Sequence, residues 1–279
     1  MSDTRGEVLR IVGTMAVVCA LGAAVLGGIY VATERYAEAA NLASERRAIA
    51  DMLGVPASAQ VLEVDKFLAP ARREVIYRAQ PFGGQAAHAR QVVFTLEGGL
   101  VSQDSLAPAG EAAVKGLTPL GRTFLASHDG RPAGFVIEGV TRGYKNRIRF
   151  FVALSNEWEV LGVRVVEHEE DPGLGAEVAT RWFQGQFLGR GADEVRALEV
   201  TKSPMPEDWR AALARLQRTP VAQWRAAHGG LIERERSNSI YAVTGATISS
   251  RALTDGVRLT VDHFRRRWEL VAPHLGVAS

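Results

Sequence analysis

The feature of this sequence that most constrains its fold is an uninterrupted apolar segment near the start of the chain. Residues 11–32 contain no Asp, Glu, Lys or Arg. As a helix this segment would be about 33 Å long, enough to cross the hydrocarbon core of a bilayer. A signal peptide has a shorter apolar region, although the Ala-rich stretch 37–40 leaves cleavage open as an alternative. We therefore expect residues 1–33 to be a retained membrane anchor in contact with lipid.

Small residues recur at every fourth position of the anchor, at Ala16, Ala20, Ala24 and Gly28. This spacing places them on one face of the helix, where another helix could approach closely and bring in membrane partners. The alternative is that Ala and Gly are simply frequent in this segment. Arginines flank the segment on both sides, so the charge distribution sets no orientation in the membrane.

The composition beyond the anchor is that of an ordinary globular domain. The 279-residue chain is 47% hydrophobic and 23% charged, and its net charge of +2 gives no sign of a nucleic-acid partner. The single cysteine, Cys19, lies within the apolar segment. This count excludes an intrachain disulfide, and the chain alone cannot supply an iron–sulfur cluster or a thiolate zinc site. We predict no metal site and no nucleic-acid binding.

Short apolar and alternating runs in the remaining sequence predict strands joined by tight turns. Residues 34–56 have the pattern of a juxtamembrane helix that ends at Gly54 and Pro56. A soluble domain is then expected over 57–279. Gly98 and Gly99 separate two apolar runs, which indicates a β-hairpin. The predicted strands are 92–96, 100–101, 135–140, 147–154 and 160–168.

Helical patterns dominate the last third of the chain. The final one, over 250–270, has apolar residues spaced by four, four, three and four. Strands and helices in mixed order predict an α+β domain with antiparallel hairpins and a C-terminal amphipathic helix, behind one transmembrane helix. Three helices are predicted: one after Gly175, one over 207–216 and one over 250–270. The residues expected to be buried are Val178, Trp182, Phe183 and Phe187 in the first helix, and Leu253, Val257, Val261, Phe264 and Trp268 in the last.

The segment 241–250, which reads YAVTGATISS, combines small residues with hydroxyls at the expected start of the last helix. Gly245 and Ala246 leave room for a large group, and the hydroxyls of Thr247, Ser249 and Ser250 lie near unpaired helix amides that favour a phosphate. Helix capping by the same hydroxyls is the alternative. From the residues alone, the cap is the simpler interpretation.

A second segment, 167–175, reads EHEEDPGLG and has the pattern of a strand that ends in an acidic turn. His168 among carboxylates raises the possibility of a metal ligand, but a lone histidine of this kind is more often a surface residue.

Together the two segments resemble the motifs of the FMN-binding domain family. Thr244-Gly245-Ala246-Thr247 is similar to the flavin-attachment motif, and 168–175 is similar to a His-x-Glu-Thr-Pro-Gly-Leu-Gly turn near the flavin. The resemblance covers about residues 134–270 and implies FMN esterified through its phosphate to Thr247. It also implies flavin contacts from Thr244, Gly245, Ala246, Ser249, Ser250, His168, Glu170, Gly173, Leu174 and Gly175, with Lys202 as a weaker candidate.

Three segments depart from the family pattern. Tyr241 stands where the family usually has Asp, and Asp171 stands where the turn has Thr. The family's Gly-Tyr-Gly-Gly stretch reads Gly143-Tyr144-Lys145-Asn146 here. These departures put the efficiency of flavin attachment and the shape of the flavin pocket in question.

The family includes the G subunit of Rnf ion-translocating complexes and the C subunit of sodium-pumping NADH:quinone oxidoreductases, and the His-containing turn is closer to the former. The resemblance implies an electron-transfer subunit of a ferredoxin:NAD oxidoreductase in the bacterial inner membrane, with redox partners in other subunits, an extracytoplasmic domain and no complete active site of its own. The alternatives are a stand-alone membrane flavoprotein or regulator, a flavin-less assembly subunit, and an anchored binding domain without cofactor.

Overall fold

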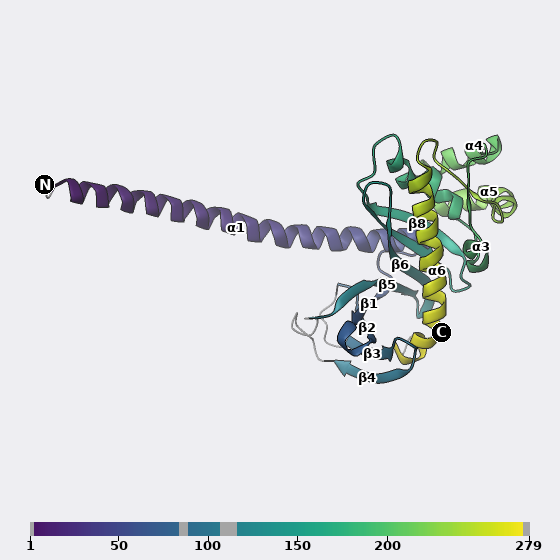
Figure 1. Cartoon of the computed structure of the whole chain (residues 1–279), viewed down its shortest axis with the longest axis horizontal. Helices are drawn as coiled ribbons and strands as arrows, with labels where there is room; N and C mark the ends of the chain where they lie inside the picture. The colour runs from purple at the N-terminus through teal and green to yellow at the C-terminus, as the bar shows by residue number, and fades with distance from the viewer. Residues whose placement is uncertain (1–2, 84–88, 107–115, 276–279) are drawn as a thin grey trace. The chain divides into compact units, whose positions relative to one another are not determined.

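A computed structural model of the chain describes residues 3–83, 89–106 and 116–275, and divides into two units, Met1–Ala48 and Ile49–Ser279. Most of the first unit is helix α1, which runs without interruption from Asp3 to Leu53 and whose last turn belongs to the second unit (Figure 1). The anchor and the juxtamembrane helix, predicted separately from composition, therefore form one helix. It ends as predicted, because Gly54 takes a φ of 68° and the amide of Val55 donates to the carbonyl of Ala50.

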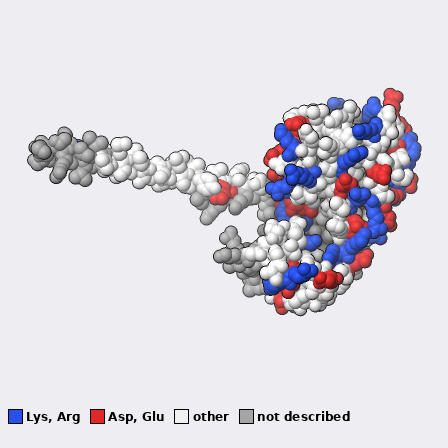
Figure 2. All heavy atoms as spheres, viewed as in Figure 1, with Lys and Arg blue, Asp and Glu red and all other residues white. Residues whose placement is uncertain are grey.

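The part of α1 that could cross a membrane is Val12–Tyr30, with a mean hydropathy of 2.1 and no side chain buried. Figure 2 shows its described atoms as an uncharged surface, whereas both charge signs are mixed over the second unit.

The second unit is built on one eight-stranded sheet in the order β4-β3-β2-β1-β5-β6-β7-β8. Every neighbouring pair in it is antiparallel, which confirms the predicted α+β class with antiparallel hairpins. The hairpin around Gly98 and the three later strands are found as expected. The strands are β1 (Gln60–Ala69), β2 (Glu74–Pro81), β3 (Ala89–Thr95), β4 (Leu100–Leu106), β5 (Thr118–His128), β6 (Arg131–Arg142), β7 (Arg147–Leu154) and β8 (Val160–Glu167), with the 3₁₀ turn η1 (Pro70–Arg72) between β1 and β2.

The last helix, α6 (Thr247–Leu275), packs along one face of this sheet, chiefly against β6 (Figure 1). Its contact with the sheet is close because a Cβ at Gly256 would lie 3.0 Å from the ring of Phe150. The apolar residues predicted from spacing do face the core: Leu253, Val257 and Val261 are fully buried. α6 therefore fixes its own N-terminus relative to the sheet, which matters for the site below.

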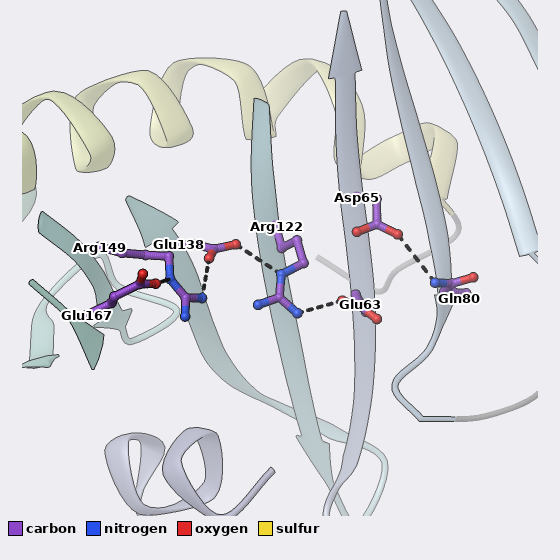
Figure 3. A network of polar contacts seen from close by, with 7 residues as sticks. All are labelled: Glu63, Asp65, Gln80, Arg122, Glu138, Arg149 and Glu167. Atoms are coloured by element: carbon purple, nitrogen blue, oxygen red, sulfur yellow. Dashed lines mark hydrogen bonds and ion pairs between the residues drawn. The ribbon is translucent and has the colours of Figure 1, made fainter. Parts of the chain in front are cut away.

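The opposite face of the sheet has a second, smaller core and a row of paired charges. Ile49, Met52 and Leu53 from the last turn of α1 pack with Phe124 and Phe151. Beside them, a network of hydrogen bonds and ion pairs joins neighbouring strands (Figure 3). Its residues are Gln80, Asp65, Glu63, Arg122, Glu138, Arg149 and Glu167, in order from β2 to β8.

The region after Gly175 differs from the prediction of one helix. Thr180 has a ψ of 151°, an extended conformation that interrupts the helical path, and short elements follow instead. Val178, Phe183 and Phe187 are nevertheless fully buried as predicted, whereas Trp182 is only partly buried and the continuous helix was wrong. The short elements are η3 (Gly175–Ala179), α2 (Arg181–Gln184), η4 (Gly185–Phe187) and α3 (Ala192–Arg196).

Two longer helices close this side of the unit. α4 (Glu207–Leu216) matches the prediction, whereas α5 (Val221–Glu235) was not predicted. They enclose a core around Trp209 and Trp224. Between them and α6, β9 (Val200–Thr201) pairs in parallel with β10 (Ile240–Tyr241). This two-strand pairing brings the loop after Thr201 beside the segment that leads into α6.

Candidate flavin site

A cleft of about 650 Å³ lies at the N-terminal end of α6, where three segments distant in the sequence meet. The β6–β7 turn, the acidic turn after β8 and the segment leading into α6 each contribute to it. The structure thus brings together the two motifs singled out in the sequence. The lining residues are Tyr144, Glu170, Asp171, Leu174, Gly175, Lys202, Ala242, Val243, Thr244, Gly245, Ala246, Thr247, Ile248 and Ser249.

The three hydroxyls at the start of α6 have different roles. Ser250 is fully buried; its hydroxyl donates to the carbonyl of Ala246 at 2.9 Å and accepts from the amide of Val243 at 3.0 Å. The hydroxyl of Ser249, also buried, donates to the carboxylate of Glu170. The hydroxyl of Thr247 forms no hydrogen bond to any described residue, and Thr247 is half-buried in the cleft wall. Of these three, only Thr247 presents an uncommitted hydroxyl to the cleft.

The backbone at this point also favours an anion. α6 begins at Thr247, so the residue before it is Ala246, whose methyl group cannot accept a hydrogen bond from the first helical amides. The capping alternative therefore does not account for these hydroxyls. The N-terminal residues of α6 line the cleft, and none of the described side chains accepts a hydrogen bond from the first amides of the helix, an arrangement suited to a phosphate. Gly245 has a φ of 79° and makes the turn before α6. A Cβ at this position would lie 3.0 Å from the side chain of Leu174, so glycine allows the close approach of Leu174.

Glu170 is the central buried charge of the site and is 4% exposed. Its carboxylate accepts hydrogen bonds from the amide of Lys145 at 2.9 Å, from the amide of Tyr144 at 3.3 Å and from Ser249. Desolvation opposes ionisation of Glu170, but the hydrogen bonds from Ser249 and the backbone of the β6–β7 turn outweigh it and lower its pKa. Glu170 therefore joins all three segments of the cleft as a carboxylate.

Two glycines leave the space that this carboxylate occupies. A Cβ at Gly175 would lie 2.5 Å from Oε2 of Glu170 and 2.8 Å from Oγ of Ser249. A Cβ at Gly143 would collide with the other carboxylate oxygen. Gly175 and Gly143 are thus required by close packing around Glu170, which the sequence pattern alone did not indicate.

The remaining side chains of the cleft suit a flat aromatic group next to an anion. Tyr144, Leu174 and Ile248 line the cleft and are 67%, 47% and 58% exposed, an unusual degree for large apolar side chains. Among the charged residues that line the cleft, Asp171 is paired with Lys145 and Glu170 is hydrogen-bonded. Lys202 has no such partner among the described residues. Tyr144 and Ile248 were not predicted as site residues.

A second hollow of about 800 Å³ adjoins the cleft and shares Lys202, Ala242, Val243 and Thr244 with it. Gly173 and Trp182 line this hollow, and so does Tyr241. The backbone of Tyr241 is held from both sides by the Gln186 amide group, at 2.8 Å and 3.2 Å. Tyr241 therefore belongs to a buried connection between β10 and η4.

His168 is not among the residues that line the cleft or the adjoining hollow. Its Nδ1 atom is buried and has no hydrogen-bond partner among the described residues. The described residues contain no group of three or more His, Cys, Asp or Glu side chains placed to hold a metal ion. The predicted flavin contact from His168 stays a prediction.

Comparison with known proteins adds to this geometry. Residues 143–262 match the model of the FMN-binding domain family. This segment is therefore similar to an FMN-binding domain. It begins at Gly143 in the β6–β7 turn, contains every predicted site residue and ends within α6.

Relatives of the chain are named as subunits of ion-translocating complexes. The chain is 28% identical over 139 residues to the G subunit of the proton-translocating ferredoxin:NAD(+) oxidoreductase complex of Clostridium ljungdahlii, covering 50% of this chain and 57% of that protein. It is 26% identical over 143 residues to the G subunit of the Na(+)-translocating ferredoxin:NAD(+) oxidoreductase complex of Acetobacterium woodii, covering 51% and 54%. The matched region thus spans little more than half the length of these relatives.

Among solved structures, the chain is similar to the crystal structure of NqrC from Shewanella oneidensis, with a TM-score of 0.40 and 20% sequence identity. The match covers 63% of this chain and 80% of that one.

Proposed function

We propose that this chain is an electron-transfer subunit of a membrane-bound, ion-translocating ferredoxin:NAD oxidoreductase complex, and that it carries FMN as a phosphoester on Thr247. The observation that supports this most directly is the uncommitted hydroxyl of Thr247 at the mouth of a cleft within an FMN-binding domain. The names of the relatives supply the class of complex.

FMN supplies redox chemistry, since it exchanges electrons singly or in pairs. The chain supplies binding and orientation. The first amides of α6 and the ammonium group of Lys202 bind the phosphate, and Tyr144, Leu174 and Ile248 provide apolar surface for the ring. Glu170 holds the three segments of the cleft in place, and the covalent bond to Thr247 prevents loss of the flavin.

The partners in this proposal are other subunits. The sequence has no Gly-x-Gly-x-x-Gly fingerprint after a strand, so a partner subunit binds the dinucleotide. The segment Val12–Tyr30 anchors the chain in the inner membrane beside these subunits. We place the FMN-binding domain on the extracytoplasmic side. An alkaline phosphatase fusion at the C-terminus tests this placement, because the enzyme is active only outside the cytoplasm; an inactive but intact fusion contradicts it.

The attachment is tested on full-length protein produced in a host that contains the flavin transferase. On a denaturing gel the wild-type band fluoresces under ultraviolet light, and its intact mass exceeds that of the chain by one FMN less one water. Thr247→Ala abolishes both signals. Ser237→Ala is the control, since it removes an exposed hydroxyl that does not line the cleft, and it keeps both. An unmodified wild-type mass contradicts the proposal and favours the flavin-less assembly subunit.

Co-purification separates the remaining alternative. A subunit of a complex is recovered with other membrane proteins after mild solubilisation. A stand-alone flavoprotein is recovered as a monomer with reductase activity of its own.

A further inference from the structure

A second cavity, of about 380 Å³, lies between α6 and the face of the sheet formed by β1, β2, β5 and β6. It is separate from the flavin cleft: Gly256, the first residue of α6 that lines it, lies about 14 Å along the helix from Thr247. Its strands all precede residue 143, so most of its wall lies outside the segment that matches the FMN-binding domain. The function proposed above makes no use of this cavity.

Lys66 is an unexpected residue in the wall of this cavity. Side chains alternate along β1, and its neighbours on the same face, Val64 and Leu68, pack in the main core. Across the strand pair Lys66 is directly opposite Tyr77, and its ammonium group lies 6.0 Å from the centre of that ring. The pairing of β1 with β5 shifts register immediately after Lys66, an irregularity that often redirects side chains near binding sites.

Two cations of this cavity, Lys66 and Arg267, have no ionic partner among the described residues. Among the described residues, no acidic side chain pairs with Lys66, and the hydrogen bond of Arg267 goes to the neutral carbonyl of Leu96 at 3.1 Å. Burial lowers the pKa of the Lys66 ammonium group, and the positive charge of Arg267 lowers it further. Arg122, which also lines the cavity, and Arg149 are by contrast each paired with carboxylates (Figure 3).

The hydroxyl of Tyr77 is the third donor. Tyr77 is 7% exposed, and its hydroxyl oxygen is buried without a hydrogen-bond partner among the described residues. Burying a hydroxyl without a partner costs free energy, and so does burying an ammonium group without a counter-ion. Lys66, Arg267 and Tyr77 thus border one cavity without an ionic partner among the described residues. The carboxylate that also lines this cavity, Glu138, is already paired with Arg122 and Arg149, which indicates that the acceptor for the three donors is a ligand.

Much of the remaining wall is apolar. Ile137, Val140, Leu259, Phe264 and Trp268 line the cavity, and its volume is within the range of small-molecule sites. Such walls suit a hydrocarbon body better than a free inorganic anion. His263, exposed on α6, also lines the cavity, whereas the carboxylate of Glu138 is engaged by Arg122 and Arg149. We propose that this cavity binds a medium-chain amphipathic carboxylate, whose headgroup contacts Lys66, Arg267 and Tyr77 and whose chain lies against Phe264 and Trp268.

The test is calorimetric titration of full-length protein in lipid nanodiscs with octanoate, with empty nanodiscs subtracted. We expect saturable binding of one octanoate per chain. Neutral 1-octanol and inorganic phosphate are expected to bind at least roughly tenfold more weakly, because octanol lacks the negative charge and phosphate lacks the hydrocarbon chain. The absence of saturable octanoate binding overturns the proposal, and so does equal binding of octanol or phosphate.

Variants locate the headgroup. Lys66→Met is expected to weaken octanoate binding roughly tenfold or more, and Tyr77→Phe severalfold. Arg258→Met is the matched control, because Arg258 is an α6 cation paired with Asp255 at 2.9 Å and does not line the cavity; its affinity stays unchanged. Thr247→Ala also leaves the affinity unchanged, which separates this site from the flavin.

Thermal unfolding without ligand distinguishes a binding role from a structural one. If the Lys66 ammonium group is held for a ligand, Lys66→Met unfolds at the same or a higher temperature than the wild type. Tyr77→Phe removes only an unpartnered hydroxyl and keeps the fold in either case. Wild-type affinity in both variants overturns the proposal.

Discussion

The ammonium group of Lys145 lies 2.7 Å from the carboxylate of Asp171, and this ion pair connects two of the positions at which the chain departs from the motifs that it resembles. Lys145 departs from the glycine-rich stretch, and Asp171 departs from the Thr of the turn. The next departure, Asn146, donates to Glu169 at 2.7 Å across the same gap. The departures are therefore linked: they join the β6–β7 turn to the acidic turn, around the carboxylate of Glu170.

The pair predicts an asymmetric effect of single substitutions on flavin attachment. Lys145→Gly leaves the negative charge of Asp171 unpaired in the wall of a cleft that receives a phosphate, so the flavin content should fall by roughly two- to fivefold under limiting transferase. Asp171→Thr leaves the positive charge of Lys145 unpaired and should not lower the flavin content. The double variant should return to the wild-type value. The measurement is the ratio of flavin absorbance to protein, and equal losses in both single variants would contradict this account.

Glu170 should be the most important polar residue for the stability of the site. Glu170→Gln removes a buried carboxylate that accepts from two backbone amides and Ser249, and we expect it to lower the free energy of unfolding by about 2–4 kcal/mol. Glu169→Gln is the neighbouring control, because Glu169 is exposed; its effect should stay below about 0.5 kcal/mol. Chemical denaturation measures both.

The effect of Glu170→Gln should also depend on pH. Because the folded-state pKa of Glu170 lies below its ordinary value, the folded state binds fewer protons than the unfolded state as the carboxylate titrates. The stabilisation is therefore fully present above the unfolded pKa of about 4.3 and is lost as pH falls through the folded pKa. The stability difference between wild type and Glu170→Gln should shrink below about pH 4. A difference that is constant with pH would show that packing alone is responsible.

The parts of the fold that were predictable are those fixed by local periodicity. The spacing of Leu253, Val257 and Val261 identified the buried face of α6, and Gly98 with Gly99 marked the β3–β4 hairpin. The helix expected after Gly175 failed because periodicity reports burial, not continuity, and Thr180 breaks the helix while its neighbours stay buried. β1, β2 and β5 were not predicted, because apolar and polar residues are mixed along them. Their strand structure becomes regular only when the strands pair with one another.

The sequence predicted where the candidate site lies, but not which of its hydroxyl groups has which role. The sequence placed three hydroxyls at the start of α6 and could not rank them by geometry. Ser249 is committed to Glu170, which is 79 residues away in the sequence, and Ser250 is committed to the local backbone. The same long-range contact explains Gly143 and Gly175, whose role depends on a carboxylate from another segment. Such roles follow from tertiary packing, which no local pattern contains.

Gly175 should tolerate no side chain. Gly175→Ala places a Cβ within 2.5 Å of Glu170 and 2.8 Å of Ser249, so we expect a loss of about 1–3 kcal/mol of stability and a lower flavin content. Gly230→Ala is the control: Gly230 lies in α5 with nothing within 4 Å, and alanine there should be neutral or stabilising by about 0.5–1 kcal/mol. Thermal unfolding and flavin content of the two variants are compared. A Gly175→Ala protein with wild-type values for both would refute the close packing around Glu170.

The last turn of α1 should behave as part of the folded domain although it continues the anchor helix. Ile49, Met52 and Leu53 are 0%, 9% and 8% exposed and pack in the core that contains Phe124 and Phe151. Each such side chain stabilises the domain by about 1.5–3 kcal/mol through burial. A chain of residues 44–279 should therefore be water-soluble and cooperatively folded, whereas 54–279 should unfold at a clearly lower temperature. Circular dichroism during heating measures this.

A pair of substitutions in the 44–279 chain separates packing from helix length. Leu53→Ala should lower the free energy of unfolding by about 2–5 kcal/mol, because it opens a cavity in that core. Asp51→Ala, in the same turn but exposed, should change it by less than about 0.5 kcal/mol. If the two shortened chains unfold at the same temperature and Leu53→Ala has no effect, α1 contributes only a tether, and the boundary of the folded domain lies after Leu53.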